Sequence, residues 1–275
     1  MVRNVKLNTD VILVGIQLLF FVLLIIFVFP HSKDDRIIGQ IRKDGVRFET
    51  GRVIVWVEKD YLDKKAIEEF GELADKGIRD IENYLKITFD KEHFSGEKPA
   101  YFLKSGKFIS RCCECNPLFR KPYIILCGSY LKTAPYLYLT VRLVAWNSNE
   151  RWLQDGLALY LNDKLGGWPT WPNFGVDLDL KAKNYFEDGN PLKYFALEMY
   201  KKIGENTAPQ FEIGEYEIFS VLSASFVKYL DDNLGTDQFM SIYESKNPKQ
   251  TIYQLTRKGM DKWKDEWLSY ICKEK

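Results

Sequence analysis

The chain contains two histidines, His31 and His93, and their small number limits the chemistry that the sequence can support. Most hydrolytic metal sites and most Ser or Cys catalytic triads need at least one histidine. The sequence places no histidine beside the cysteines. It also places none beside the serines considered as nucleophiles, which are Ser129, Ser220 and Ser225. The sequence therefore argues against nucleophilic catalysis.

Most of the cysteines fall in one short stretch, and their spacing allows three chemistries. Cys112 and Cys115 form a Cys-x-x-Cys pair, which is common in metal and redox sites, but no second pair completes a zinc site. In an extracytoplasmic domain, these residues would more often form a disulfide that ties the loop at 110–116 to a strand at Cys127. We expect at least one disulfide among Cys112, Cys113, Cys115 and Cys127, with structural thiols or a metal site as alternatives.

The strongest candidate site lies in a segment that reads Glu150-Arg-Trp-Leu-Gln-Asp-Gly-Leu-Ala-Leu-Tyr-Leu161 and follows a helix predicted at 134–146. This segment resembles the Trp-Leu-x-Glu-Gly-Leu-Ala-x-Tyr segment of the peptidase MA-like, or gluzincin, family of thermolysin-type zinc metallopeptidases. In that family the Glu is the third zinc ligand. An earlier helix carries His-Glu-x-x-His, in which both His bind the metal and the Glu is the general base.

Three later segments extend the resemblance in the same order along the chain. Residues 223–230 match a Ser-Phe-Val-x-Tyr-Leu helix, residues 233–239 match a Gly-bounded turn with a short helix, and residues 263–270 match a closing Glu-Trp-x-x-Tyr helix. The match spans about residues 46–271. It implies a thermolysin-like domain with a mixed sheet half and a helical C-terminal half.

The metal-binding residues of that family are missing from this chain. Where His-Glu-x-x-His is expected, the helix reads Tyr138-Leu-Thr-Val-Arg-Leu-Val-Ala-Trp146, without His or Glu. Asp155 occupies the position of the third ligand, but one carboxylate cannot hold zinc alone. The resemblance therefore implies a domain that has lost its zinc. We predict no catalytic residue, no metal and no cofactor.

The residues around the lost site have two interpretations each. Arg142 either pairs with Asp155 across two packed helices or faces solvent. Trp168 and Trp171 either line a peptide-binding cleft or pack in the core, while Trp152 matches a packing tryptophan of the family. We expect the helix at 137–146 to pack against the helix at 152–160, with Asp155 at their interface. The candidate cleft residues are Arg142, Trp146, Glu150, Trp152 and Tyr160.

An α+β domain is predicted to position these residues. Two β-rich runs at 46–49 and 53–57 flank a short turn, which indicates a hairpin. Asp63 is a predicted N-cap of a long amphipathic helix, because apolar residues then recur every three or four positions. Further strands are predicted at residues 100–103 and 123–127.

From residue 134 onward every strong signal is helical, so the domain divides into two halves. We expect a sheet-containing half at 46–133 and a helical half at 134–275, together forming a peptidase MA-like domain at 46–275.

The N-terminal part predicts attachment to a membrane. Val11 to Phe29 is an apolar run of about 20 residues, which is long enough for a helix to cross a ~30 Å hydrocarbon core. We predict a 1–10 tail, an uncleaved anchor at 11–30 and a charged linker at 31–45, because no small-x-small cleavage site follows the run. The short tail favours an extracytoplasmic position for the folded domain.

The overall charge indicates no affinity for nucleic acid, because 39 Lys and Arg against 38 Asp and Glu leave a net charge of +1. The combined prediction is a single-pass, membrane-anchored, non-catalytic peptidase-like domain that binds a peptide or a partner protein in the former active-site cleft. The alternative is an active metallohydrolase in which Asp155, Glu150 and a third group meet around a metal.

Overall fold

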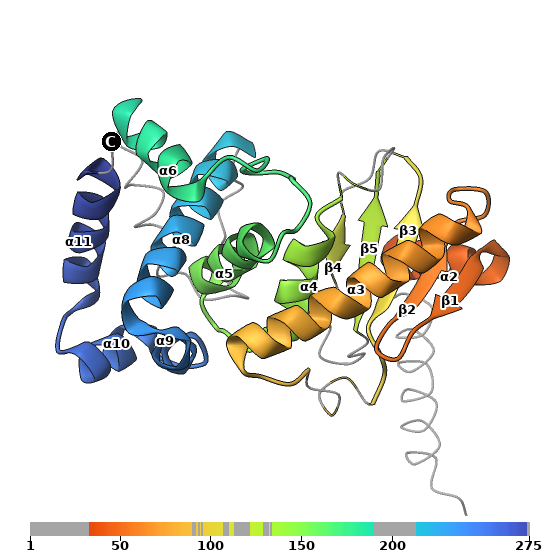
Figure 1. Cartoon of the computed structure of the whole chain (residues 1–275), viewed down its shortest axis with the longest axis horizontal. Coiled ribbons are helices and arrows are strands. Elements are labelled where there is room, and N and C mark those ends of the chain that lie inside the picture. Colours follow the sequence, from red (N-terminus) through yellow and green to blue (C-terminus); the bar gives the residue numbers. More distant parts are fainter. Residues whose placement is uncertain are drawn as a thin grey trace, which may run out of the picture.

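The computed structural model describes residues 33–89, 92, 94, 96–106, 110–112, 122–128, 132, 134–189 and 213–273. Within these residues the chain is an α+β protein with a mixed sheet in its N-terminal half and a helical C-terminal half (Figure 1). The anchor predicted at 11–30 and the tail before it lie outside the described residues. Of the helices within the described ranges, none has the length and apolar character needed to span a bilayer.

Five described strands form one mixed sheet in the order β1-β2-β3-β5-β4. The predicted hairpin is confirmed, since β1 and β2 are antiparallel neighbours. The predicted strands at 100–103 and 123–127 are also confirmed, and β2, β3 and β5 run parallel. The strand bounds are Val46–Glu49 (β1), Ile54–Val57 (β2), Ala100–Lys104 (β3), Arg111–Cys112 (β4) and Tyr123–Cys127 (β5).

The long helix α3 (Lys64–Leu85) covers one face of the sheet and continues beneath the first helices of the other half (Figure 1). It begins as predicted, because a side-chain oxygen of Asp63 accepts a hydrogen bond from the Ala66 N–H at 2.8 Å. Its buried residues recur at helical spacing and include Ile67, Ile78 and Leu85. This helix therefore joins the sheet half to the helical half.

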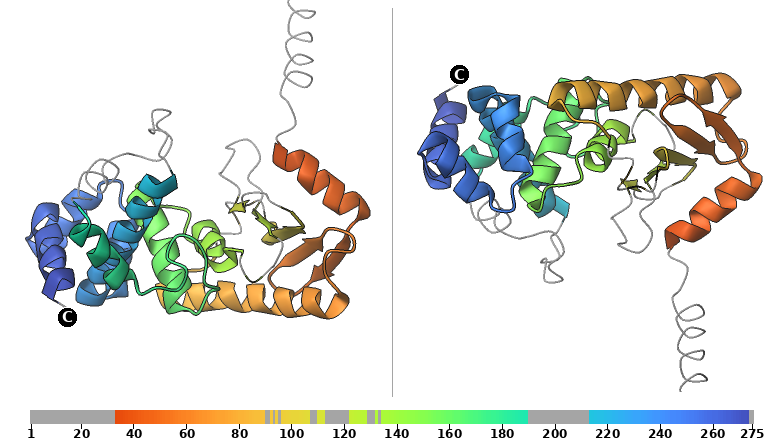
Figure 2. Two further views of the ribbon diagram at one scale, coloured as in Figure 1. Left: turned by 90° about the horizontal axis from the view of Figure 1, so that it is seen from above. Right: turned by 90° about the horizontal axis from the view of Figure 1, so that it is seen from below.

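Residues 33–44 form helix α2 (Lys33–Asp44), so the structure differs from the linker predicted at 31–45. Ile37 and Ile41, one turn apart, are buried against Phe102 and Ile125 on the face of the sheet opposite α3 (Figure 2). Two apolar residues in a charged segment give a weak sequence signal, although they suffice to pack a short helix. The folded unit therefore begins before residue 46.

The helical half is built around α8, which packs against α5, α6, α9 and α11. The three C-terminal segments identified in the sequence lie in α8, at the Gly235 turn with α9, and in α11. The bounds of these helices are Tyr136–Val144 (α4), Arg151–Lys164 (α5), Leu178–Glu187 (α6), Ile213–Leu234 (α8), Thr236–Tyr243 (α9), Pro248–Thr256 (α10) and Met260–Lys273 (α11).

Gly156 allows α5 and α8 to pack closely. A Cβ atom at this position would lie 2.7 Å from the carbonyl oxygen of Ser223 and 2.8 Å from a methyl carbon of Val227. Real Cβ atoms do not approach backbone oxygens so closely, so the glycine sets the separation of the two helices that carry most of the site.

We expect Gly156→Ala to destabilise the protein by about 1–3 kcal/mol, because the added methyl group forces α5 and α8 apart. The matched control is Gly39→Ala on α2, where a Cβ would meet no atom within 4 Å. That change should be neutral or stabilising by up to about 1 kcal/mol. Urea unfolding followed by tryptophan fluorescence measures both, and equal effects of the two substitutions would contradict this view of Gly156.

Candidate functional site

The candidate site is centred on Asp155, whose side chain lies at the interface between α4 and α5 and is only 1% exposed. The turn between these helices is held by Gln154, whose side-chain amide donates to the carbonyl oxygens of Trp146 and Ser148, each at 2.9 Å. The helices expected at 137–146 and 152–160 therefore pack as predicted. A buried carboxylate at this position requires compensating charge and hydrogen bonds.

Two arginines supply that compensating charge. Nη1 of Arg142, on α4, lies 3.4 Å from Oδ1 of Asp155, and Nε of Arg151, one turn earlier on α5, lies 3.4 Å from Oδ2. The Arg142 side chain is 24% exposed and that of Arg151 is 32% exposed. Of the two interpretations of Arg142, the structure therefore has the pair with Asp155, in which the arginines reach the carboxylate from partly exposed positions.

Two tyrosine hydroxyls complete the shell of the carboxylate. Tyr138, on α4, donates to Oδ1 of Asp155 at 3.1 Å, and Tyr216, on α8, donates to Oδ2 at 2.8 Å. Burial and the negative charge of Asp155 raise the pKa of Tyr138 well above its ordinary value and raise the pKa of Tyr216 to about 12. Both phenols therefore stay protonated and act as donors across the physiological pH range.

Aromatic groups cover the outer side of this cluster. The ring of Trp171 stacks on Tyr216 with the centroids 5.4 Å apart, and the guanidinium of Arg151 lies over the rings of Tyr216 and Phe219 at 4.9 and 5.9 Å. Trp168 instead packs against Tyr136 at a centroid distance of 4.6 Å. Trp171 therefore lies beside the candidate site, whereas Trp168 contributes to the packing around α4.

The donor set around Asp155 does not fit a zinc ion. Both oxygens of the carboxylate already accept from cationic or hydroxyl donors, and the other side chains in its shell are arginine and tyrosine. Arginine carries no lone pair for a metal, and a zinc site takes three or four His, Cys, Asp or Glu ligands. Within the described ranges, no three His, Cys, Asp or Glu side chains are grouped as a metal site requires.

The two residues of α4 that contact Asp155, Tyr138 and Arg142, lie four positions apart in the sequence. Tyr138 and Arg142 reach the carboxylate from one face of α4, as the two His of a His-Glu-x-x-His helix reach a metal. The residue after Tyr138 is the buried Leu139, whose side chain is apolar. The arrangement holds a negative charge in place, and donors of the protein contact both oxygens of the Asp155 carboxylate.

The remaining candidate cleft residues separate into two groups. Trp152 and Tyr160, 1% and 3% exposed, are buried in the core, so they do not line a cleft. Trp152 packs near Phe226 of α8, with the ring centroids 5.7 Å apart. Glu150 is half-buried at the N-cap of α5, and Trp146 is half-buried at the edge of a separate hollow.

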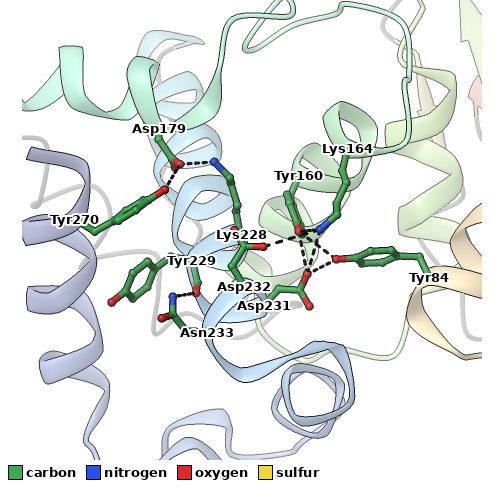
Figure 3. A network of polar contacts seen from close by, with 10 residues as sticks. All are labelled: Tyr84, Tyr160, Lys164, Asp179, Lys228, Tyr229, Asp231, Asp232, Asn233 and Tyr270. Atoms are coloured by element: carbon green, nitrogen blue, oxygen red, sulfur yellow. Dashed lines mark hydrogen bonds and ion pairs between the residues drawn. The ribbon is translucent and has the colours of Figure 1, made fainter. Parts of the chain in front are cut away.

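A second polar cluster, which the sequence did not predict, ties α3, α5 and α8 together (Figure 3). Oδ2 of the buried Asp231 accepts hydrogen bonds from the hydroxyls of Tyr84 and Tyr160, the latter at 2.9 Å. Nζ of Lys164 donates to the Tyr160 hydroxyl at 2.5 Å and lies 3.9 Å from the same carboxylate oxygen. The sequence signal for this cluster was the spacing of Tyr160 and Lys164, which lie one helical turn apart on α5.

A third buried carboxylate, Asp179 on α6, joins α6 to α8 and α11. It pairs with Lys228, and the hydroxyl of Tyr270 lies 3.5 Å from it (Figure 3). It also accepts a hydrogen bond from the hydroxyl of Ser225 at 2.6 Å. The indole N–H of Trp267 donates to Ser225 at 2.9 Å. This cluster lies within the packing of the three helices and has a structural role.

The cysteine prediction falls mainly outside the described residues. Cys113 and Cys115 are not described, and Cys112 is described only as part of β4. Cys127 is buried at the end of β5, and Cys272 is exposed near the end of α11. No disulfide joins two cysteines in the described part of the chain. The disulfide expected among Cys112, Cys113, Cys115 and Cys127 therefore stays a prediction.

Comparisons with known proteins give no family assignment. No protein-family model matches the sequence, and no curated protein matches it.

The pairing across α4 and α5 predicts coupled effects on stability. We expect Asp155→Ala to cost about 2–4 kcal/mol, because it leaves two guanidiniums without their shared carboxylate. Arg142→Ala should cost about 1 kcal/mol, since Arg151 and both hydroxyls still support the charge. Urea unfolding of both single variants and the double variant should give a coupling energy of about 1 kcal/mol. Strictly additive effects would contradict the pairing.

The raised pKa of Tyr216 predicts that the stability of the protein falls at alkaline pH. An unfolded tyrosine ionises at about pH 10, whereas the folded pKa of Tyr216 is about 12 because of burial and the charge of Asp155. Its contribution to stability is complete below pH 10 and is lost as the pH rises through 12. Tyr216→Phe should lower stability by about 1.5–3 kcal/mol at pH 8 through the lost hydrogen bond, and the difference from the parent should shrink toward pH 12.

The control for this measurement is Tyr253→Phe, which changes an exposed tyrosine on α10. Its unfolding free energy, measured in urea from pH 8 to pH 11.5, should follow that of the parent. A constant difference between the Tyr216→Phe variant and the parent over that pH range would rule out the proposed contribution.

Proposed function

We propose that this chain is a non-catalytic, thermolysin-like peptidase domain that is anchored to a membrane by residues 11–29 and binds a peptide or partner protein beside Asp155. The observation that carries the proposal is the shell around Asp155. Tyr138 and Arg142 contact this carboxylate from α4 at the spacing that two metal-binding His would have. A domain of this ancestry would keep its helix packing after losing its metal, because the fold does not depend on the reaction.

The rim of the cluster supports binding. Arg142 and Arg151 reach the surface from the buried carboxylate. Trp171 is half-buried and stacks on Tyr216, the ring over which the Arg151 guanidinium lies. Guanidinium groups present planar sets of N–H donors to carbonyl or carboxylate oxygens, and tryptophan contributes a large rigid contact surface. Residues of these types are enriched among the side chains that dominate protein interfaces.

The alternative, a metallohydrolase that uses Asp155 and Glu150, has less support. Its metal would have to displace hydrogen bonds and ion pairs from four side chains at Asp155. Glu150 lies at the start of α5, one helical turn and a residue away from Asp155 in sequence, and makes no side-chain cap there. We therefore propose binding rather than hydrolysis.

Selection of a random peptide library displayed on phage against the full chain in a neutral detergent tests the proposal. We expect enriched peptides whose affinity falls about tenfold in Arg151→Lys, because lysine retains the charge but loses the planar fork and its contact with Tyr216. Glu187→Gln, an exposed change on α6, is the matched control and should bind as the parent does. Failure to enrich any peptide, or chelator-sensitive cleavage of the enriched peptides, would refute a non-catalytic binding role.

A further inference from the structure

A hollow of about 570 Å³ lies where the segment after α3 meets the ends of α4 and α9. Its apolar wall consists of Ile87, Phe89, Val144 and Trp146. Val144 and Arg142 are two residues apart on α4, so their side chains point about 200° apart around the helix axis. The hollow is therefore separate from the Asp155 cluster, and a ligand bound in it would be independent of the function proposed above.

Two carboxylates stand at the edge of the hollow, Glu92 and Glu244, and both residues are exposed. The side-chain amide of Asn147 donates to Oε1 of Glu244 at 3.0 Å, which holds this carboxylate at the lining. Neither Glu92 nor Glu244 forms an ion pair with another described residue. The nearby Lys86, which follows α3, is instead paired with Asp237 at 2.7 Å.

A second hollow, of about 310 Å³, shares Thr88 and Phe89 with the first. Its lining includes Arg52 and Glu82, which are paired with each other. The negative charge of the first hollow is therefore not balanced from this side. Because they share lining residues, the two hollows adjoin each other along the segment after α3.

We propose that the larger hollow binds a basic segment of a partner polypeptide, with an arginine or lysine side chain inserted into it. The apolar wall suits the aliphatic stem of such a side chain, and Trp146 offers an aromatic ring near the cationic head. Glu92 and Glu244 pair with that head at the rim, where charge-assisted hydrogen bonds are strong. A polyanion such as nucleic acid is disfavoured at the same place because both carboxylates would repel it.

The volume of the hollow agrees with this occupant. Ligand pockets typically measure about 300–1,000 Å³, and this one, at about 570 Å³, lies within that range. The shared residues Thr88 and Phe89 let an extended segment continue from the first hollow toward the second. The bound segment therefore carries one basic side chain flanked by apolar residues.

The test uses the full chain in a neutral detergent and the peptide acetyl-Ala-Leu-Arg-Leu-Ala-amide carrying an uncharged fluorophore. Its matched partner carries citrulline in place of arginine, which retains the shape and removes the charge. Fluorescence anisotropy at low salt should show about tenfold tighter binding of the arginine peptide, because two carboxylates attract the cation. The preference should weaken as salt screens these exposed charges.

Glu92→Gln combined with Glu244→Gln should reduce the ratio of the two affinities to about one, since glutamine retains an acceptor for Asn147 but removes the charge. Trp146→Leu should weaken both peptides. Glu187→Gln, which removes an exposed carboxylate from α6, should leave the ratio unchanged. Equal affinity of the two peptides, an unchanged ratio in the double variant, or no binding at millimolar peptide would overturn the proposal.

Discussion

The burial of one negative charge organises the junction of α4, α5 and α8. Isolated burial of the Asp155 carboxylate would cost several kcal/mol, so its oxygens must be surrounded by cations and hydroxyl donors. Those donors come from α4, from α5 itself and from α8. Since the shell is complete only when all three helices are in place, their relative orientation is linked to the neutralisation of this carboxylate. Gly156, one residue later, permits the close contact that brings Tyr216 of α8 within reach.

The same principle recurs at two other places in the helical half. Asp231 on α8 accepts hydrogen bonds from tyrosine hydroxyls of α3 and α5 (Figure 3). Asp179 on α6 contacts polar side chains of α8 and α11. The apolar core supplies most of the driving force for packing, while hydrogen-bonded carboxylates select one arrangement among those that bury similar area. One candidate binding surface lies where the Asp155 cluster reaches solvent through Arg142 and Arg151. The other lies at Glu92 and Glu244, exposed carboxylates that have no cationic partner among the described residues.

The sequence predicted the parts of the fold that follow from period and capping. The hairpin, α3 with its Asp63 cap, the parallel strands and the helical half all carry regular apolar spacing. Asp155 and Arg142 were singled out through the resemblance to the gluzincin family, which left Arg142 either paired with Asp155 or facing solvent, and the structure has the pair. Tyr216 was missed, since it lies 61 residues from Asp155 and nothing local marks it as a donor. Helix α2, within the segment predicted as a linker at 31–45, was not predicted for a related reason: Ile37 and Ile41 become buried only when they pack against the sheet. Tyr160, a candidate cleft residue, is buried, and so is Trp152, which the resemblance matches to a packing tryptophan.

Side-chain donors of the protein surround the Asp155 carboxylate, and we expect that no metal binds there. Anomalous diffraction from crystals of the protein grown with added zinc, recorded above and below the zinc absorption edge, would detect a metal at this carboxylate. We expect no anomalous peak at Asp155 and electron density for both guanidiniums and both phenols around its carboxylate. A zinc peak within about 2.0–2.2 Å of an Asp155 oxygen, with Arg142 turned away into solvent, would contradict the claim.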